Sequence, residues 1–286
     1  MGEYEKRGYL LENFRLFHLR TEQAPQVEFH YHEFCKLVLL VSGSGCYVVD
    51  GHRYLLQAGD VVLIGSHSVH RPELNPDVPY ERIIIFISPE FLQRESTGSC
   101  DLQDCFYRQQ MHVLRLREPG RKKLFAMAAA LEQELSREEY GRDIASNAAL
   151  LRLLVQLGRD LRREDAQNPL PIVPQNSRVA ELMHYIDTHL EEDLDIDRLA
   201  EQFYISKYHM MRLFRRETGS TIYAYLSQRR LLHARGLIGS GMRATEACYR
   251  SGFGSYSSFT RAFSKYFHTT PTGRAGELPD QGPQWE

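Results

Sequence analysis

The sequence predicts an α+β protein of two domains, an N-terminal β-barrel followed by amphipathic helices and a C-terminal all-α domain. Residues 13–87 form short runs of alternating apolar and polar side chains, separated by turn residues, which is typical of an antiparallel sandwich or barrel. Residues 121–163 change to helical spacing, and the pattern from residue 177 onward is helical. A chain of 286 residues is long enough for two separate cores.

Within the barrel, short strands are expected at close and regular intervals. They are Phe14–Leu19, Val27–Tyr31, Cys35–Val41, Gly45–Val49, Arg53–Leu56, Val61–Ile64, Arg82–Ile87 and, after an irregular stretch, Met111–Leu116. The connections carry Gly, Ser, Asn, Asp and Pro, as in Asp50-Gly51, and these residues favour reversals of the backbone.

Two amphipathic helices are expected after the barrel, over Arg121–Glu139 and Arg142–Arg163. In the second helix, apolar residues from Ile144 to Leu161 recur at helical spacing. Either helix can cover the outside of the barrel or form a dimer seam. We expect one helix to serve each purpose, and Arg142–Arg163 is the predicted dimer helix.

These features divide the chain into five parts. They are a cupin-like, effector-binding barrel (1–118), a helical dimerisation segment (119–163), a linker (164–176), a helical domain (177–275) and a tail (276–286). The linker holds three prolines and no helical pattern, so we expect it to be stiff.

Composition favours an intracellular protein. The five cysteines are odd in number and scattered, which is typical of reduced thiols. The polar N-terminus does not resemble a signal peptide, and the longest apolar runs are far shorter than a bilayer span. We therefore expect a cytoplasmic location and no membrane partner.

Positive charge is concentrated near the C-terminus. The segment Ser206–Ala275 has twelve Lys or Arg residues and two acids, a net charge of +10, within a chain whose total is −2. Concentrated cationic charge on a folded segment indicates a partner with a phosphate backbone.

The same segment predicts two helix-turn-helix motifs. The expected helices of the domain are Val179–Leu190, Ile196–Phe203, Lys207–Glu217, Ile222–Gly236, Ala244–Ser251 and Tyr256–Phe267. Three-residue turns join the second helix to the third and the fifth to the sixth, as in helix-turn-helix motifs. Ser206 and Ser255 occupy the N-cap positions of the two proposed recognition helices.

Each recognition helix divides into an apolar face and an exposed face of aromatic, hydroxyl and Arg side chains, which suits the major groove. Nearby Ser and Lys residues and the helix N-termini can meet phosphates. The candidate DNA-binding residues are Ser206, Lys207, Tyr208, Met211, Arg212, Arg215, Arg230, Tyr256, Ser257, Thr260 and Arg261. The helix between the motifs, which contains Arg230, is long enough to hold the recognition helices about one DNA turn apart.

The run "ISKYHMMRLFRRETG…YLSQRRLLHAR" and the later run "EACYRSGFGSYSSFTRAFSKYFHTTP" resemble the DNA-binding domain of the AraC/XylS family of bacterial transcription regulators. The resemblance covers about Ser177–Ala275, a third of the chain. It implies that Tyr208, Met211 and Arg212, and in the second motif Tyr256, Ser257, Thr260 and Arg261, occupy base-facing positions. One departure is Cys248 or Tyr249, where the family usually carries an aliphatic residue.

The N-terminal part resembles the cupin motifs. His30, His32 and Gly43 keep the spacing of the first motif, but Lys36 replaces its glutamate, and His70 stands where the second motif supplies its histidine. The resemblance implies that the three histidines converge inside the barrel. The usual Pro and Gly of the second motif are also absent.

These four residues, His30, His32, Lys36 and His70, are the candidate effector site. The favoured interpretation is a sensor pocket that binds a polar or anionic small molecule. A divalent metal on the three histidines is the alternative, although a protonated lysine would repel it and cannot ligate it. A structural barrel without a ligand is the third option. We assign no cofactor and no catalytic residue.

Two main hypotheses follow. The first is a transcription regulator, an activator by the family resemblance, that binds double-stranded DNA as a homodimer under the control of a small-molecule effector; a contact with RNA polymerase is left open. The second is a metal-dependent cupin enzyme with a fused helical domain. A constitutive DNA-binding protein with a purely dimerising barrel is a further alternative. The basic segment and Lys36 favour the first hypothesis, in which the protein is not an enzyme.

Overall fold

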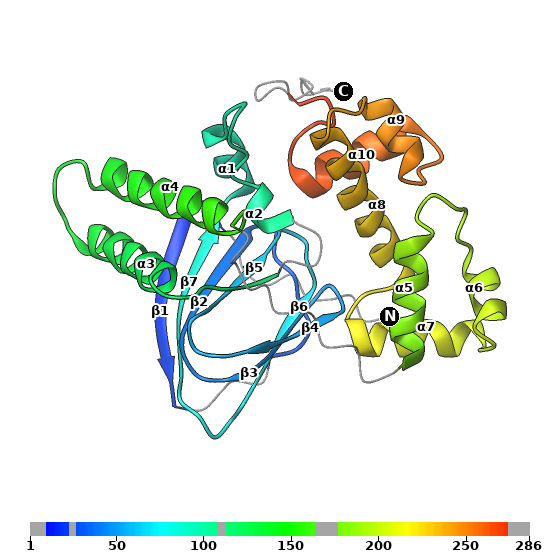
Figure 1. Ribbon diagram of the computed structural model, residues 1–286, viewed down its shortest axis with the longest axis horizontal. Helices are drawn as coiled ribbons and strands as arrows, with labels where there is room; N and C mark the ends of the chain where they lie inside the picture. The colour runs from blue at the N-terminus through cyan, green and yellow to red at the C-terminus, as the bar shows by residue number, and fades with distance from the viewer. Residues whose placement is uncertain (1–9, 23–26, 108–111, 164–176, 274–286) are drawn as a thin grey trace, which may run out of the picture.

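The computed structural model describes residues 10–22, 27–107, 112–163 and 177–273 (Figure 1). The predicted linker (164–176) and tail (276–286) lie outside the described residues. The predicted α+β class is confirmed, with a β-rich N-terminal part and a helical C-terminal part. Among the described residues, no helix combines the length and the hydropathy that a membrane span needs.

Two antiparallel sheets form the N-terminal part. The larger sheet has the order β1 (Phe14–Thr21), β7 (Tyr80–Ile87), β2 (Cys35–Ser42), β5 (Asp60–Ile64) and β8 (Val113–Arg115). The smaller sheet has the order β4 (His52–Leu56), β3 (Gly45–Val49) and β6 (His70–Leu74).

The register of β2 and β7 gives the larger sheet two different faces. Lys36 pairs with Phe86 and Leu40 with Arg82, and directly opposed residues share a face. This inner face packs with Tyr47 and Tyr54 of the smaller sheet in one apolar cluster. The alternate residues of β2 and β7 form the opposite face, which packs against helices.

Among its described residues, the N-terminal part has the helices α1 (Pro89–Glu95), α2 (Asp104–Tyr107), α3 (Gly120–Ser136) and α4 (Arg142–Asp160). The long helices α3 and α4 lie side by side on the outer face of the larger sheet, away from the C-terminal helices (Figure 1). Leu150, Leu153 and Leu157 of α4 are fully buried there, whereas Ile144 remains 77% exposed. Thus α4 covers the barrel with one face and leaves apolar surface on another.

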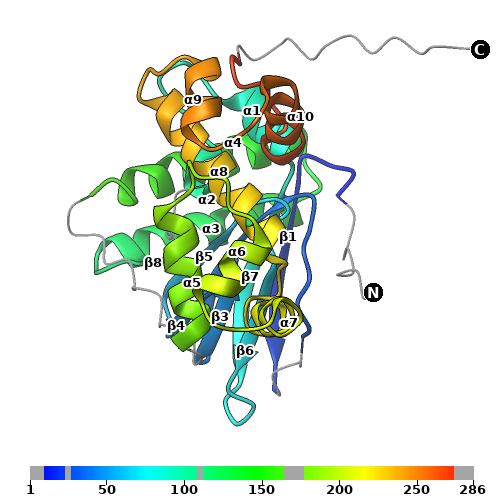
Figure 2. The same cartoon turned by 90° about the vertical axis from the view of Figure 1, so that its right-hand side faces the viewer.

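The C-terminal part contains the six predicted helices: α5 (Ser177–Thr188), α6 (Ile196–Gln202), α7 (Lys207–Thr218), α8 (Ile222–Gly239), α9 (Ala244–Arg250) and α10 (Tyr256–Phe267). The start of α8 packs with α5–α7 in one cluster. Leu231 and Ala234, further along α8, pack with α9 and α10. The C-terminal helices lie along one side of the barrel, with α10 beside α1 and α7 beside β6 (Figure 2).

Three sequence expectations need correction. The expected strand Val27–Tyr31 forms only an isolated bridge, between His30 and His70, and its Phe29 packs against Gly219 of the C-terminal part instead of within a sheet. The strand β6 is absent from the sequence expectations; it carries Pro72 and is an edge strand, where proline is tolerated. The short helices α1 and α2 were also missed.

Candidate DNA interface and effector site

The first recognition helix, α7, presents the side chains that the sequence assigned to DNA. Its N-cap Ser206 accepts a hydrogen bond from the backbone N of His209. Tyr208 is 85% exposed and Met211 38% exposed, and Arg212 is exposed as well. The apolar residues of the opposite face are buried in the core. The helix therefore offers an aromatic, an apolar and a cationic side chain on one surface.

The second recognition helix, α10, is built on three buried phenylalanines, Phe259, Phe263 and Phe267, at intervals of four residues. Ser257 and Arg261 are exposed on its other face. The half-buried Tyr256 and Thr260 join them, but the hydroxyl of Thr260 donates to the carbonyl of Tyr256 over 2.9 Å. A base contact by Thr260 would thus use its methyl group or a rotated hydroxyl.

Part of the positive charge of this segment is internal. Arg229 is buried and pairs with Asp187 at 2.7 Å, and Arg235 pairs with Asp101 at 2.5 Å. Near the surface, Lys207 meets Asp197 at 2.8 Å. The charge available to DNA is therefore smaller than the sequence total of +10 suggests.

Arg230, a candidate DNA-binding residue, has an intramolecular role. Its Nε donates to the carbonyl of Leu190 over 3.0 Å, and its Nη2 donates to the carbonyl of Glu192 over 2.6 Å. These bonds hold the middle of α8 to the segment that follows α5. A phosphate contact by Arg230 would have to replace them.

The structure brings the three predicted histidines together. His30, His32 and His70 are all buried, and their candidate ligand atoms lie within 4.8 Å of one another. Nδ1 of His30 donates to the carbonyl of Glu28 over 2.8 Å, and Nδ1 of His70 donates to that of Ser68 over 2.9 Å. In its neutral form, each of these two rings would therefore carry its lone pair on Nε2.

The histidine cluster has the donor chemistry of a transition-metal site. Imidazoles whose Nδ1–H groups bond to carbonyls are oriented as metal-ligating histidines are, and Nε2 of His70 has no hydrogen-bond partner among the described residues. Burial, followed by the charge of Lys36, holds the pKa of His70 well below its ordinary value, so this ring is neutral. Three imidazoles placed in this way could, in their neutral forms, hold Zn²⁺ or a similar ion.

Lys36 lies beside the histidines on the inner face of β2. It is only 9% exposed, and its Nζ donates to the hydroxyl of Tyr47 over 3.3 Å. Burial, with a smaller contribution from Arg82, lowers the pKa of Lys36 to about 8. The ammonium form thus still dominates at neutral pH.

Arg82 is a second buried cation that the sequence reasoning missed. It is 8% exposed and donates to the hydroxyl of Thr21 and the carbonyl of Tyr80, over 3.0 and 3.3 Å. Its guanidinium lies 4.5 Å from the ring centroid of Tyr80. The sequence signal that could have identified this buried cation is an arginine directly before the apolar run of β7. Within the described ranges, no carboxylate forms an ion pair with Lys36 or Arg82.

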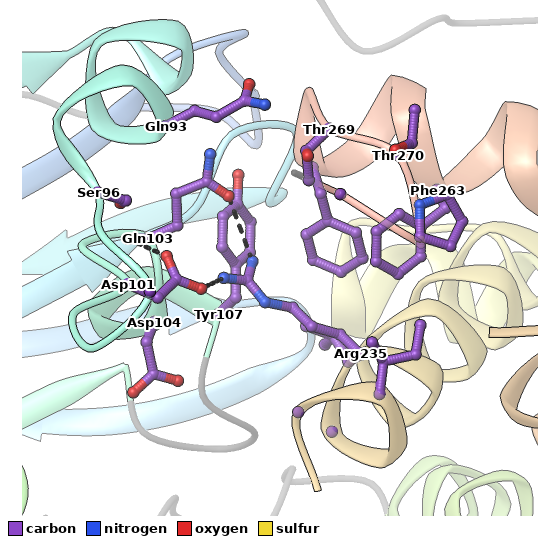
Figure 3. Close-up of a pocket in the computed structure, with 18 of the residues that line it drawn as sticks. Gln93, Ser96, Asp101, Gln103, Asp104, Tyr107, Arg235, Phe263, Thr269 and Thr270 are labelled. Carbon is purple, nitrogen blue, oxygen red and sulfur yellow. Dashed lines mark hydrogen bonds and ion pairs between the residues drawn. The ribbon is translucent and has the colours of Figure 1, made fainter. Parts of the chain in front are cut away.

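A cavity of about 880 Å³ lies between the two parts of the molecule. Figure 3 shows Arg235 reaching from α8 to Asp101 and Gln103, beside Tyr107. The guanidinium of Arg235 lies 4.9 Å from the ring centroids of both Tyr107 and Phe267. The described domains are therefore joined by charged and aromatic contacts.

A β-rich domain with a buried cationic site, joined to two helix-turn-helix motifs, defines a ligand-responsive DNA-binding regulator. Residues 17–154 match the AraC-like ligand binding domain, and residues 199–273 match a helix-turn-helix domain. The chain belongs to the AraC/XylS family of transcription regulators. It is a DNA-binding regulator of transcription under the control of a small-molecule effector.

The chain is similar to several proteins along part or most of its length. The HTH-type transcriptional activator RhaS of Escherichia coli is 28% identical over 261 residues, which cover 89% of this chain and 91% of RhaS. The fatty-acid-bound structure of ToxT from Vibrio cholerae is 15% identical, with a TM-score of 0.37, over 92% of this chain and 95% of ToxT. The DNA-binding domain of AdpA, solved with a target DNA, is 30% identical, with a TM-score of 0.32, over 33% of this chain and 86% of that domain.

Proposed function

We propose that the protein activates transcription in the bacterial cytoplasm, and that its effector is an anionic small molecule bound inside the barrel. The observation that supports this most directly is the pair of buried cations, Lys36 and Arg82, on one face of the larger sheet. Burying a charge is costly unless an opposite charge or several hydrogen bonds compensate for it. A carboxylate or phosphate on the ligand would supply that charge.

The histidines complete the proposed effector site. His30, His32 and His70 lie within reach of one another beside Lys36, and neutral imidazoles can accept or donate hydrogen bonds. The rings of Phe34 and Phe86 lie 4.5 and 5.8 Å from that of His32. The proposed ligand therefore combines an anionic group with a smaller apolar part.

A binding screen tests this proposal. The full-length protein would be screened by thermal shift against a panel of carboxylates, phosphates and neutral analogues, with Lys36→Met as the variant and Lys122→Met, an exposed residue of α3, as the control. We expect an anionic compound to stabilise the wild type and the control but not Lys36→Met. Stabilisation by neutral compounds alone, or an undiminished response of Lys36→Met, would refute the anionic assignment.

The proposed DNA contacts are those of α7 and α10, with Tyr208, Met211 and Arg212 in the first half-site and Ser257 and Arg261 in the second. Their exposure on two recognition helices supports this assignment. Ser206, Lys207, Arg215, Tyr256 and Thr260 are proposed as flanking contacts. Selection from random DNA should recover a motif with two elements about one helical turn apart.

We further propose that the protein is a homodimer and not an enzyme, with α4 at the dimer seam. A groove of about 570 Å³ between α3 and α4 is lined by apolar residues, among them Met127, Leu151 and Val155. The exposed Ile144 also lies on α4. A second copy would cover this surface. Because α4 lies away from α7 and α10 (Figure 1), such a dimer would leave both recognition helices free to bind DNA, and a contact with RNA polymerase would remain possible.

A metal ion on the three histidines is the second candidate, because their ligand atoms lie within 4.8 Å of one another. It would supply a coordination site for the anionic group of an effector, or, in a cupin enzyme, Lewis-acid chemistry. Metal analysis of the purified protein and titration with Zn²⁺ or Ni²⁺ test it. Stoichiometric binding that is lost in His70→Ala would support the metal, and no binding to the wild type would exclude those ions.

A further inference from the structure

The segment Phe29–His32 extends from the proposed effector site to the C-terminal end of α7, and it is linked to the end of α10 through His67. It is held to β6 by two backbone hydrogen bonds between His30 and His70, over 3.2 and 2.9 Å. The rings of His30 and His70 lie 4.3 Å apart, and those of His30 and His32 lie 5.0 Å apart. Any ligand that contacts these histidines therefore acts directly on this segment.

Phe29 connects the segment to α7. Its ring lies against Gly219, the C-cap of α7, whose φ is +75°. A Cβ built on Gly219 would lie 2.5 Å from Cδ1 and 2.6 Å from Cγ of Phe29, which is closer than carbon atoms approach. The guanidinium of Arg71, next to His70, lies 4.2 Å from the centroid of the same ring. Phe29 thus fills the place that a side chain at position 219 would need.

A neighbouring contact strengthens this attachment. Gly51, in the turn between β3 and β4, approaches Thr218 at the last position of α7; a Cβ on Gly51 would lie 3.0 Å from that of Thr218. The hydroxyl of Thr218 donates to the carbonyl of Phe214 over 2.9 Å. The C-terminal end of α7 therefore contacts both Phe29 and the turn between β3 and β4.

His67 connects the same segment to α10. Its backbone N donates to the carbonyl of His32 over 2.7 Å, and its ring lies 5.7 Å from that of His268 and 6.2 Å from that of Tyr266. His268 is the C-cap of α10 and meets Glu90 of α1 at 3.1 Å. A displacement of His32 would reach α10 through one hydrogen bond and one ring contact.

We propose that Phe29 is a positioning residue, which transmits the occupancy of the histidine–lysine site to α7 while His67 transmits it to α10. This deepens the proposed function and rests on it, since the ligand of that site is taken to be the effector. Two recognition helices must meet successive segments of the major groove about 34 Å apart. A shift of the end of α7 relative to the end of α10 changes that fit. The ligand-bound and ligand-free arrangements of the two helices would therefore differ in affinity for DNA.

Hydrogen exchange of the full-length protein tests the coupling without an identified ligand. The perturbation is Lys36→Met, which removes the charge at the site. Lys36 itself lies on β2, away from both recognition helices. We expect it to change the exchange rates of the backbone amides at Arg216–Thr221 by about twofold or more, the low end of the effects seen for coupled residues. In the Phe29→Ala background this response should vanish, whereas amides of β5 should still respond.

Two further variants separate transmission from simple loss of packing. Phe29→Leu keeps an apolar side chain against Gly219 and should restore the response, and Phe125→Ala, on α3, should leave it intact. The cycle of Lys36→Met and Phe29→Ala should also be non-additive, by about twofold or more, in affinity for a selected DNA site. No response at α7 in the wild-type background, a response that persists in Phe29→Ala, or additive affinities would each overturn the proposal. The ligand screen with Lys36→Met is a separate experiment. It can refute the anionic effector while hydrogen exchange still shows the coupling, and hydrogen exchange can refute the coupling while the screen still identifies an anionic ligand.

Discussion

The buried ammonium of Lys36 should make the ligand-free protein less stable than it would be with an apolar residue at that position. Its pKa falls from 10.5 to about 8 on folding, mainly because of burial. At 1.36 kcal/mol per pKa unit this corresponds to about 3 kcal/mol of lost stability at neutral pH. Lys36→Met removes this cost but leaves the hydroxyl of Tyr47 without its donor, a loss of about 1 kcal/mol. The net expected gain is about 2 kcal/mol.

The assay is thermal unfolding of wild type and Lys36→Met at a series of pH values. A gain of about 2 kcal/mol corresponds to a rise of about 3 °C in Tm for a chain of 286 residues. The folded state binds fewer protons than the unfolded state between pH about 8 and 10.5, so the wild type recovers stability across that window. The advantage of the variant should be full below pH 8 and should disappear toward pH 10.5.

The outcome also bears on the ligand. A bound anion would stabilise the ammonium of the wild type, so a saturating anionic effector should reduce or reverse the advantage of Lys36→Met. A variant that is less stable than the wild type at pH 7, or an advantage that does not change with pH, would refute the reasoning. Either result would mean that Lys36 is already compensated within the protein.

Three further predictions concern DNA and assembly. Arg212→Ala and Arg261→Ala should each weaken binding to the selected DNA site by about 1–3 kcal/mol and relax its sequence preference; unchanged discrimination in competition binding would contradict a base-facing role. Arg230→Ala should lower Tm, because it removes two hydrogen bonds to carbonyls, while leaving the salt dependence of DNA binding unchanged; a flatter salt slope would instead indicate a phosphate contact. Ile144→Asp should shift the protein toward monomer in analytical ultracentrifugation, and an unchanged mass would place the dimer seam elsewhere.

Local sequence signals were sufficient for the C-terminal helices. The apolar spacing, the N-cap serines Ser206 and Ser255, and the short turns are all features of neighbouring residues, and the structure has both caps. Hydrogen bonds to Ser206 and Ser255 come from within the first turn of their own helices. No long-range contact was needed for these predictions.

The proposed effector site was predicted only in part, because its other members depend on strand register. His30, His32 and His70 stand out as residue types at recognisable spacing. Arg82 joins Lys36 only because β7 pairs with β2 in the register that opposes Arg82 to Leu40, and a shift by one residue would turn it outward. Contacts between domains, such as Phe29 with Gly219, likewise have no local signature.

The continuity of the core across α8 has a consequence for dissection of the protein. Leu231, Phe263 and Phe267 pack in the same cluster as Phe106 and Tyr107 of the N-terminal part. A fragment that begins at residue 177 would therefore leave an aromatic surface uncovered at the second helix-turn-helix motif, while the first motif keeps its own cluster. Such a fragment should aggregate through α10 at high concentration. The prolines that mark the boundary in the sequence thus do not mark the place where the hydrophobic core divides.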